Sequence, residues 1–395
     1  MKPLENIVVL DMSRVLAGPY CTMLLREMGA RVVKIEHPVK GDDSRHYGPF
    51  KNEKSVYFLS INREKESITV DLKKEEGIEI IKRFVKKADV LVENFRPGTM
   101  EKLGLGYETL KELNPKLIYA SLSGFGHTGP WANKPAYDMI VQALGGMMSI
   151  TGWPEGPPVR VGMSVGDIVV ALFAAIGINA AIYQRTITGK GQKLDISMLD
   201  CQLAILENAL IRYLVDGSSP APLGTRHPTI TPFQAFKTKD AWLIVAIGND
   251  KIWETFCNAL ELIELKENPK FKTNKLRCEN YIEISQILEE LFSKKTASEW
   301  EEILHTHHIP STRIAKMEEV AKNPQLKIRK MFVETEDPVI GRMTLAGNPV
   351  KMSSSEDSDK RGKAPELGEH TFSILEEFLE YDYNEIEKLK KDGVI

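Results

Sequence analysis

The first half of the chain alternates short apolar runs with longer segments in which apolar residues recur every three or four positions. The runs are rich in β-branched residues, as in NIVVLDMS (residues 6–13) and RVVKIEH (residues 31–37), and predict buried strands. Between them, AGPYCTMLLREMGA (residues 17–30) predicts an amphipathic helix. The alternation continues through SITVDL, KEEGIEIIKRFVKKA, DVLVENF, YETLKELNP and LIYASLSGFG. This order predicts an α/β domain built on a parallel sheet.

Residues after about 215 follow a different pattern. SSPAPLGTRHPTITP is rich in Pro, Ser and Gly and predicts a linker. FQAFKTKDAWLIVAIGND predicts two short strands with a turn at Lys239 and Asp240, and Lys/Glu-rich helical segments follow to about residue 325. These elements predict a second, smaller α+β domain. Beyond it, MFVETEDPVIGRMTLAGNPVKMS predicts strands, SSSEDSDKRGKAP a charged, mobile loop, and EEFLEYDYNEIEKLKK a closing helix.

These changes of pattern predict a division into domains. Residues 1–195 form the first part of the large α/β domain, and residues 225–325 form the smaller domain. Linkers cover residues 196–224 and 326–350, and residues 351–395 return to the large domain.

The composition is that of an ordinary globular protein and excludes several classes of partner. Of the 395 residues, 42% are hydrophobic and 27% are charged, which allows a large core. The net charge of -3 predicts neither a nucleic-acid nor a membrane partner. The start, MKPLENIVVLDMS, lacks the layout of a signal peptide, and the four scattered cysteines indicate reduced thiols. We therefore expect a cytoplasmic protein.

A single carboxylate stands before the most apolar segment of the chain. In VGMSVGDIVVALFAAIGINAAIYQR, Asp167 precedes an apolar run of about 16 residues, from 168 to 183. A membrane span needs roughly 20 residues, so we predict a buried helix instead. Residue type alone leaves two interpretations of Asp167 open. One is a helix cap, and the other is a nucleophile.

Other motifs fit known chemistry less well. GMSVG around Ser164 matches the serine hydrolase pattern G-x-S-x-G, but such a site needs a buried strand before it, and EGPPVRV contains two prolines and an arginine. DMSRVLAGPY lacks the G-x-G-x-x-G of dinucleotide-binding domains, and TGKGQK lacks the spacing of a Walker loop. HTHH (residues 305–308) lacks the spacing of metal ligands, so we predict no metal site.

Taken in order, the polar turns of the chain match a known family. They include DMSRVLAGPY, KIEHPVKGDDSR, VENFRPGTMEKLGLGYETL, SLSGFGHTGPW, AYDMIVQALGG, VGDIVVALFAAIG and GKGQKLDISMLD. With them the sequence resembles, over essentially its whole length, the family III CoA-transferases (CaiB/BaiF family), which include formyl-CoA transferase, carnitine CoA-transferase and α-methylacyl-CoA racemase. The resemblance implies a Rossmann-like large domain, a smaller α+β domain and an interlocked homodimer. It also implies coenzyme A as a substrate, no tightly bound cofactor, and an acyl-CoA and a carboxylic acid as partners.

The resemblance makes Asp167 the catalytic residue. It implies attack of the carboxylate on an acyl-CoA to give an aspartyl anhydride, followed by attack of the CoA thiolate to give an aspartyl-CoA thioester. Holding the carboxylate beside the thioester contributes up to roughly 7–11 kcal/mol through effective concentration. The helix start favours the charged carboxylate and burial disfavours it, and we expect the ionised form at pH 7.

The resemblance also implies a set of binding residues around Asp167, each carried over from a matching motif. They are Arg14, Val15, Leu16, Ala17, His37, Asn94, Phe95, Arg96, Lys102, Leu103, Tyr137, Asp138, Gly248, Asn249 and Asp250. His37 is expected near the adenine or ribose of CoA, and Lys102 near a phosphate. Residues 248–250 are expected to shield the anhydride from water. Leu16 stands where formyl-CoA transferase has a glutamine, which removes a polar group able to bind a small diacid.

The sequence allows four functions, of which CoA transfer is preferred. Racemase relatives place a histidine where this chain has Tyr137, and tyrosine, with a reference pKa of about 10, is a poor base near pH 7. We therefore predict CoA transfer between an acyl-CoA and a carboxylic acid, with α-methylacyl-CoA racemisation as the alternative. A serine hydrolase and an inactive CoA-binding protein are further alternatives. A dicarboxylate such as succinate as one partner follows only by analogy with relatives.

Overall fold

The computed structural model describes residues 2–395, which divide into two compact units. Unit 1 comprises Met1–Met147, Arg160–Asp216 and Pro324–Ile395, and unit 2 comprises Met148–Val159 and Gly217–Asn323. Each unit has its own hydrophobic core, and unit 1 has separate cores on the two faces of its main sheet.

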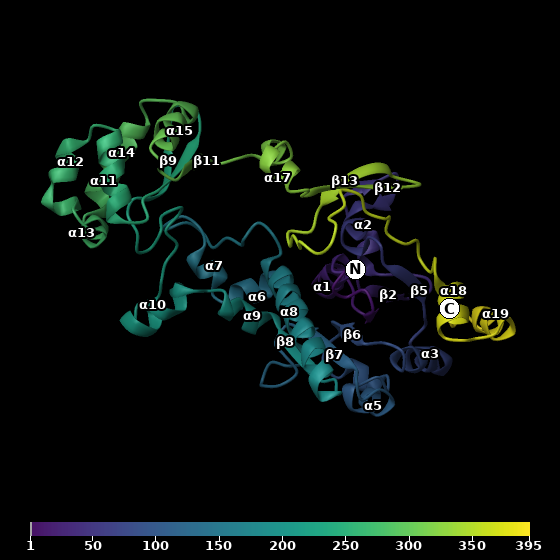
Figure 1. Cartoon of the computed structure of the whole chain (residues 1–395). Helices are drawn as coiled ribbons and strands as arrows, with labels where there is room; N and C mark the ends of the chain where they lie inside the picture. Colours follow the sequence, from purple (N-terminus) through teal and green to yellow (C-terminus); the bar gives the residue numbers. More distant parts are fainter. Residues whose placement is uncertain (1) are drawn as a thin grey trace. The chain divides into compact units, whose positions relative to one another are not determined.

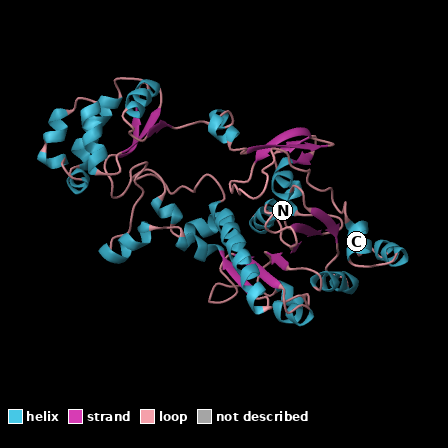
Figure 2. Cartoon of the chain, viewed as in Figure 1, coloured by secondary structure: helices cyan, strands magenta, loops and turns pink. Residues whose placement is uncertain are grey.

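A six-stranded parallel sheet forms the centre of unit 1 (Figures 1 and 2). The strands run in the order β5-β2-β1-β6-β7-β8, and every neighbouring pair is parallel. They are β1 (Val8–Asp11), β2 (Arg31–Glu36), β5 (Glu66–Thr69), β6 (Val90–Glu93), β7 (Ile118–Ser123) and β8 (Lys193–Ser197). This is the strand order of a Rossmann-type sheet, and the order reverses between β1 and β6. The predicted α/β fold with a parallel sheet is confirmed.

Helices and two small hairpins surround this sheet. The helices are α1 (Ala17–Glu27), η1 (Asp43–His46), α2 (Val56–Asn62), α3 (Glu75–Val85), α4 (Thr99–Lys102), α5 (Tyr107–Leu113), α6 (Asp138–Leu144), α8 (Val165–Thr188), α9 (Met198–Ala204), α10 (Asn208–Asp216), α17 (Pro324–Ile328), α18 (Thr371–Ser373), η3 (Ile374–Phe378) and α19 (Tyr383–Lys391). The hairpins pair β3 (Phe50–Lys51) with β4 (Lys54–Ser55) and β12 (Phe332–Asp337) with β13 (Gly341–Ala346).

Side chains of the central strands pack on both faces of the sheet. Val9 and Val32 belong to the core that α1 and α8 cover. Leu10 and Val33, their neighbours in sequence, belong to the core that α3, α5 and the C-terminal helices cover. Strands covered on both faces need apolar residues at successive positions. This explains why the strands appear in the sequence as continuous apolar runs.

Two ranges predicted as linkers contain regular structure. Residues 196–224 include α9 and α10, and residues 326–350 include the β12–β13 hairpin. Cys201 of α9 and Ala209 of α10 are buried, so these short helices pack against the rest of unit 1. The stretch without helix or strand is 217–232, which coincides with the segment rich in Pro, Ser and Gly.

The prediction of one continuous closing helix is wrong. The turn of π-helix η3 ends at Phe378, and α19 begins only at Tyr383. Between them Glu380 has a φ of 62°, a left-handed conformation that a right-handed helix does not accommodate. Asp382 then starts α19 with a capping box that includes Glu385.

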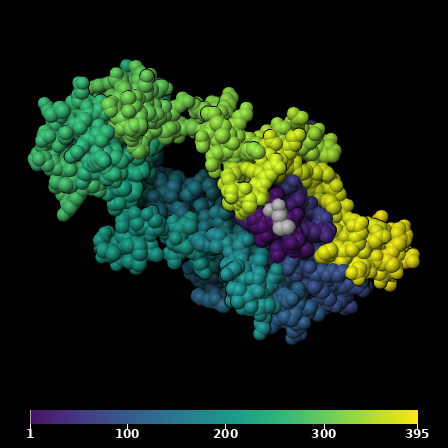
Figure 3. Space-filling view, viewed as in Figure 1, coloured from purple at the N-terminus to yellow at the C-terminus, as the bar shows by residue number. Residues whose placement is uncertain are grey.

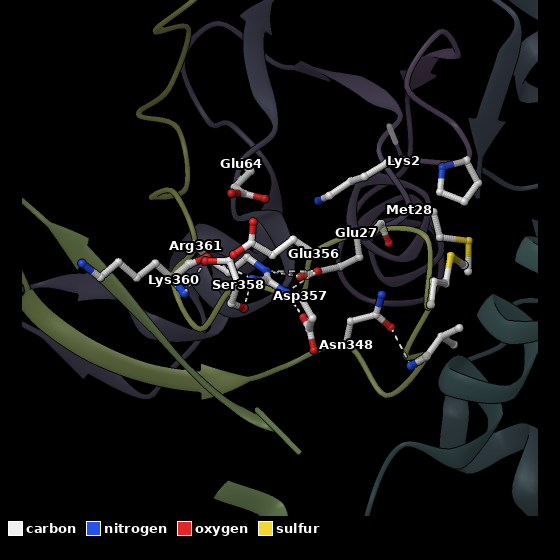
Figure 4. A pocket seen from close by; sticks show the side chains of 14 residues that line it. Lys2, Glu27, Met28, Glu64, Asn348, Glu356, Asp357, Ser358, Lys360 and Arg361 are labelled. Atoms are coloured by element: carbon white, nitrogen blue, oxygen red, sulfur yellow. Dashed lines mark hydrogen bonds and ion pairs between the residues drawn. The ribbon is translucent and has the colours of Figure 1, made fainter. Parts of the chain in front are cut away.

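The charged segment of residues 353–365, predicted to be mobile, is fixed to the N-terminal part of the chain. Figure 3 shows the C-terminal segment, in yellow, beside the N-terminal residues, in purple. Figure 4 shows Arg361 and Glu27 in the lining of one pocket, where their side chains pair at 2.9 Å. Arg63 pairs with the same carboxylate at 2.8 Å. The side chains of all three residues are at most 6% exposed, so this contact is part of the interior.

Unit 2 combines a small antiparallel sheet with helices. The sheet has the order β11-β10-β9, formed by β9 (Phe233–Lys237), β10 (Trp242–Ala246) and β11 (Ser311–Arg313). The helices are α11 (Asp250–Ala259), α12 (Ile263–Glu267), η2 (Pro269–Phe271), α13 (Asn274–Glu279), α14 (Tyr281–Phe292), α15 (Ala297–Thr306) and α16 (Met317–Val320), while α7 (Met147–Ile150) crosses the division between the units. The predicted pair of strands with a turn, followed by helices, is confirmed.

Helix α8 has two apolar faces. Val170, Ala174 and Ile178 are buried in the core beneath the sheet. The exposed apolar residues of the same helix are Leu172, Phe173, Ile176, Tyr183 and Ile187. The helix has 24 residues rather than the predicted 16, and within residues 2–395 it is the one helix long and apolar enough to cross a membrane. The length argument against a span was therefore wrong, whereas the burial of one face in the core of unit 1 is observed directly.

Candidate active site

Two cavities open where the strand order of the sheet reverses. The first, of about 360 Å³, lies among the loops after β1, β6 and β7 and contains Asp167 at the start of α8. The second, of about 300 Å³, lies among the loops after β1, β2 and β5. Arg14, Asp43 and Phe95 line both cavities, so the two meet at these residues. Open parallel sheets bind ligands at this position, outside the carboxyl ends of the strands.

The structure brings most of the expected binding residues together. The first cavity is lined by Arg14, Val15, Leu16, Ala17, Asn94, Phe95, Arg96, Tyr137 and Asp167, and the second by Arg14, His37, Phe95 and Leu103. Lys102, at the end of α4, lines neither cavity. Asp138 is buried behind the first cavity rather than lining it. Gly248, Asn249 and Asp250 lie in unit 2, where Asn249 caps α11.

Asp167 is the third residue of α8 and does not cap the helix. Ser164 occupies the N-cap position. Within residues 2–395 no hydrogen bond reaches the carboxylate of Asp167, which is partly buried and lines the first cavity. A capping carboxylate would accept N–H groups of the first turn. The interpretation of Asp167 as a helix cap is therefore wrong.

A second carboxylate, buried, fixes the backbone next to Asp167. Asp138 accepts the N–H of Gly166 through Oδ1 at 2.7 Å and the side-chain Nε2–H of Gln142 through Oδ2 at 2.7 Å. Gln142 in turn accepts the N–H of Val161 through Oε1 at 2.9 Å. Helix α6, which carries Asp138 and Gln142, thereby holds both ends of the loop that leads into α8.

Burial and a neighbouring charge perturb the carboxyl group of Asp167. Burial, together with the negative charge of Asp138, raises the pKa of Asp167 to about 7. At pH 7 the ionised form therefore competes with the protonated form, and the expectation that the ionised form prevails stays a prediction. Desolvation and a like charge outweigh the N-terminus of α8. A carboxyl group perturbed in this way inside a cleft is typical of functional sites.

Ser164 lacks the surroundings of a hydrolase nucleophile. Residues 151–164 form no strand, so the serine does not follow a strand in a sharp strand-to-helix turn. Across residues 2–395, the structure also contains no group of three or more His, Cys, Asp or Glu side chains able to hold a metal ion.

The loop after β1 is connected to two neighbouring loops. Asn94 accepts the N–H of Arg14 through Oδ1 at 2.9 Å, and its Nδ2–H donates to the carbonyl oxygen of Arg14 at 2.8 Å. The carboxylate of Asp42 accepts the N–H of Val15 at 3.1 Å. The wall of the first cavity that the loop after β1 forms is therefore held by residues that follow β2 and β6.

The sequence did not identify several residues of the first cavity. Asp43, Tyr47, Lys134 and Met198 line it. Asp43 belongs to KGDDSR, which follows a predicted strand, and its place at the carboxyl end of β2 is a signal that could have found it. Met198 directly follows β8, so the same signal could have found it. Tyr47 and Lys134 reach the cavity through tertiary packing.

Comparisons with known proteins agree with this geometry. The model for CoA-transferase family III matches residues 4–371. The chain belongs to this family. It is 42% identical to the acetyl-CoA:oxalate CoA-transferase of Acetobacter aceti over 95% of this chain and 96% of that protein. It is 41% identical to the human succinyl-CoA:glutarate CoA-transferase over 100% of this chain and 90% of that protein. Among solved structures, a CaiB/BaiF family protein from Brucella suis is 36% identical and has a TM-score of 0.83 over 95% of this chain and 99% of its own.

Membership of CoA-transferase family III gives the reaction class. The chain is a CoA-transferase that exchanges CoA between an acyl-CoA and a carboxylate. CoA enters as part of the substrate. The crevice that contains Asp167 lies outside the carboxyl ends of the strands, where open parallel sheets bind ligands.

Proposed function

We propose that this CoA-transferase works through covalent catalysis by Asp167. The observation that carries the proposal is a carboxylate without a hydrogen bond, with its pKa raised to about 7 by burial and by Asp138, at the edge of a cavity of about 360 Å³. A group without hydrogen-bond partners is free to approach a thioester, and its high pKa makes it more basic than an ordinary carboxylate.

The proposed exchange passes through two covalent intermediates on Asp167. An oxygen of Asp167 attacks the thioester carbonyl carbon of the donor, the C–S bond breaks, and CoA leaves as a thiolate. The thiolate attacks the carbonyl carbon of Asp167 in the resulting anhydride, the C–O bond breaks, and the donor acid leaves as a carboxylate. The acceptor carboxylate then attacks the aspartyl-CoA thioester, and the two steps run in reverse. No ATP and no net proton transfer are required.

The two cavities fit the two ends of the donor. The nucleotide end lies in the second cavity, beside His37 and Leu103. The pantetheine arm crosses at Arg14 and Phe95, which line both cavities, and the thioester lies in the first cavity near Asp167. Lys102 directs its charge to a phosphate from the end of α4.

The acid substrates are proposed to be dicarboxylates. The two relatives described above act on oxalate and glutarate, which both carry two carboxylates. Arg96 and Lys134 line the first cavity, are exposed, and form no ion pair within residues 2–395. Either cation can receive the carboxylate that does not react. Replacement of Lys134 by Met is expected to raise KM for glutarate about tenfold and to leave KM for butyrate unchanged.

A second copy of the chain is proposed to cover the exposed face of α8. Ile176, Tyr183 and Ile187 are 65–70% exposed in the single chain. Exposed apolar residues of α6 and α10, such as Ile140 and Leu214, add to the apolar surface of the unit. A helix with its other face in the core of unit 1 cannot leave to enter a bilayer. A homodimer, interlocked as in the family resemblance, covers this surface.

The protein is proposed to act in the cytoplasm. Cys21, Cys201 and Cys257 are free and buried, which is typical of a reducing compartment.

The competing function is racemisation of an α-methylacyl-CoA. Racemisation requires a base for the α-proton. Tyr137 stands at the corresponding place, is 81% exposed, and is a poor base near pH 7, so CoA transfer is preferred.

Mass spectrometry of the intact protein tests the proposed function. The wild type and Asp167→Asn are incubated with acetyl-, succinyl-, oxalyl- and glutaryl-CoA, and Asp216→Asn, at the exposed end of α10, is the control. We expect a CoA adduct on the peptide that contains Asp167 in the wild type and the control, and none in Asp167→Asn. Tight CoA binding without an adduct from any donor contradicts covalent transfer. Deuterium uptake at the α-carbon of a 2-methylacyl-CoA, without an acceptor acid, supports the racemase instead, and fluorophosphonate labelling of Ser164 supports the hydrolase.

A further inference from the structure

The most constrained backbone position of the active-site cavity is Val15. Its φ is 67°, in the left-handed region that suits glycine. Within residues 2–395, ten non-glycine residues have a positive φ, and Val15 is the one among them with a β-branched side chain and the one that lines the cavity of Asp167. Such strain persists only where surrounding contacts impose it, and it is concentrated at functional sites.

The backbone N–H of Val15 donates to the carboxylate of Asp42. Its Oδ1 accepts the N–H of Val15 at 3.1 Å and the N–H of Ser44 at 2.8 Å. Its Oδ2 pairs with the Nζ of Lys34 at 2.7 Å, and the same Nζ donates to the carbonyl oxygen of Ser13 at 2.8 Å. Lys34 and Asp42 therefore bind the backbone on both sides of Arg14, at Ser13 and at Val15.

This ion pair is completely buried. The side chains of Lys34 and Asp42 are 0% and 1% exposed. Burial alone would raise the pKa of Asp42, but Lys34 and the hydrogen bonds from Ser44 outweigh burial and hold the pKa far below its usual range. Burying two charges is costly, and a well-packed apolar pair often serves stability as well or better. The pair is therefore better explained by what it positions than by its contribution to stability.

We propose that Asp42, backed by Lys34, is a positioning residue for CoA transfer: it holds Val15 in its left-handed conformation and so sets part of the wall of the cavity that contains Asp167. The proposal rests on the proposed function, because the wall acts on the donor thioester. Errors of about 1 Å in such a wall cost roughly 100-fold in rate.

A double-mutant cycle tests the proposal. Glycine adopts a positive φ without strain, so in Val15→Gly the loop keeps its conformation without help from Asp42. We expect Asp42→Asn to lower kcat/KM about 10- to 100-fold in the wild type. In the Val15→Gly background, whose own kcat/KM is the reference because it lacks one side chain of the cavity wall, the same change should lower kcat/KM less than about threefold. A purely structural role of Asp42 predicts the same loss in both backgrounds, and that outcome overturns the proposal.

A matched control separates the loss of a buried ion pair from the loss of positioning. Asp337→Asn is the matched control, because Asp337 is also a buried carboxylate that pairs with a lysine, Lys54, and accepts two backbone N–H groups, those of Val339 and Ile340. It lies outside the cavity, so it is expected to lower the midpoint of thermal unfolding and leave kcat/KM unchanged.

The remaining outcomes are also informative. If Asp42→Asn alone does not fold, Val15→Gly is compared with the double variant: equal kcat/KM supports the proposal, and a loss of tenfold or more contradicts it. Formation of the CoA adduct by the wild type is measured in parallel. An adduct together with a failed rescue refutes the role of Asp42 alone, whereas no adduct in the wild type refutes the proposed function.

Discussion

The N–H of Gly166 donates to Oδ1 of Asp138 at 2.7 Å, and this bond places a buried negative charge beside Asp167. The pKa of Asp167 is raised to about 7 by burial first and by Asp138 second. One carboxylate therefore has two effects on its neighbour. It fixes the backbone from which Asp167 projects, and it makes the Asp167 carboxylate more basic.

The first prediction concerns the pH dependence of the wild type. Only ionised Asp167 attacks the thioester, so kcat/KM for the acyl-CoA donor is expected to rise with pH and level off above a midpoint of about 7. The measurement is steady-state kinetics with the donor well below its KM between pH 5 and 9. A flat profile over this range contradicts the assignment of Asp167.

Replacement of Asp138 by Asn should move this midpoint. The change removes the like charge and leaves the burial, so the pKa of Asp167 falls and kcat/KM reaches its plateau at a lower pH. Burial raises the pKa of Glu93 to about 7 as well, but Glu93 is not among the groups that shift the pKa of Asp167. Glu93→Gln is therefore the control and should leave the midpoint in place. An unchanged midpoint in Asp138→Asn would mean that another group is titrating.

Two glycines of α8 give a matched pair of variants. A Cβ at Gly166 would lie 3.1 Å from Oδ1 of Asp138, whereas a Cβ at Gly177 would meet only Cδ1 of Leu194 at 3.5 Å. Alanine in place of a helical glycine typically stabilises by about 1 kcal/mol. Gly177→Ala should show this gain in thermal unfolding with normal activity. Gly166→Ala should lose about tenfold in kcat/KM because Asp138 is displaced. Equal activity in the two variants contradicts a close fit at Gly166.

The apolar face of α8 predicts the oligomeric state. Ile176→Glu places a charge in the proposed interface, and we expect the dimer to dissociate to monomers by sedimentation velocity at micromolar concentration. Gln184→Glu, on the exposed surface of the same helix, should remain a dimer. A wild type that is monomeric, or that floats with lipid vesicles, contradicts coverage of this face by a second copy.

The buried carboxylate of Glu27 predicts a large stability effect. Arg361→Ala leaves Glu27 with Arg63 as its one arginine partner, and the free energy of unfolding in urea at pH 7 should fall by about 3 kcal/mol. Lys82→Ala breaks an exposed pair with Glu79 and should change the free energy of unfolding by less than about 1 kcal/mol.

The effect of Arg361→Ala should also depend on pH. Burial alone would raise the pKa of Glu27, but the two arginines outweigh burial and hold it below its usual value of 4.5. The pairing therefore stabilises the fold above about pH 4.5, and this contribution is lost as the pH falls through the lower pKa of the folded state. The difference between Arg361→Ala and the wild type should shrink as the pH falls below 4.5. A constant difference contradicts the role of the carboxylate.

The sequence by itself determined the large sheet and the reaction class. Apolar runs that alternate with amphipathic segments require parallel strands covered on both faces, and Val9 and Leu10 show this requirement within one strand. The ordered turns also identified the loops that line the cavities, because residues at the carboxyl ends of parallel strands meet at one edge of the sheet. Arg14 and Asn94, which are 80 positions apart, were expected at one site from the family resemblance and are hydrogen-bonded to each other.

Only the tertiary structure decided the electrostatics of the site and its support. The charge of Asp167 depends on Asp138, which is close to it because α6 packs against the start of α8, and no local pattern in the sequence reports such a distance. The same holds for Lys34 and Asp42, whose burial and contact with Val15 arise from the meeting of two loops. Periodicity and motifs determine which face of an element is buried. Energies that depend on a few ångströms between separate elements, such as a raised pKa or a strained φ, are determined only when the chain is folded.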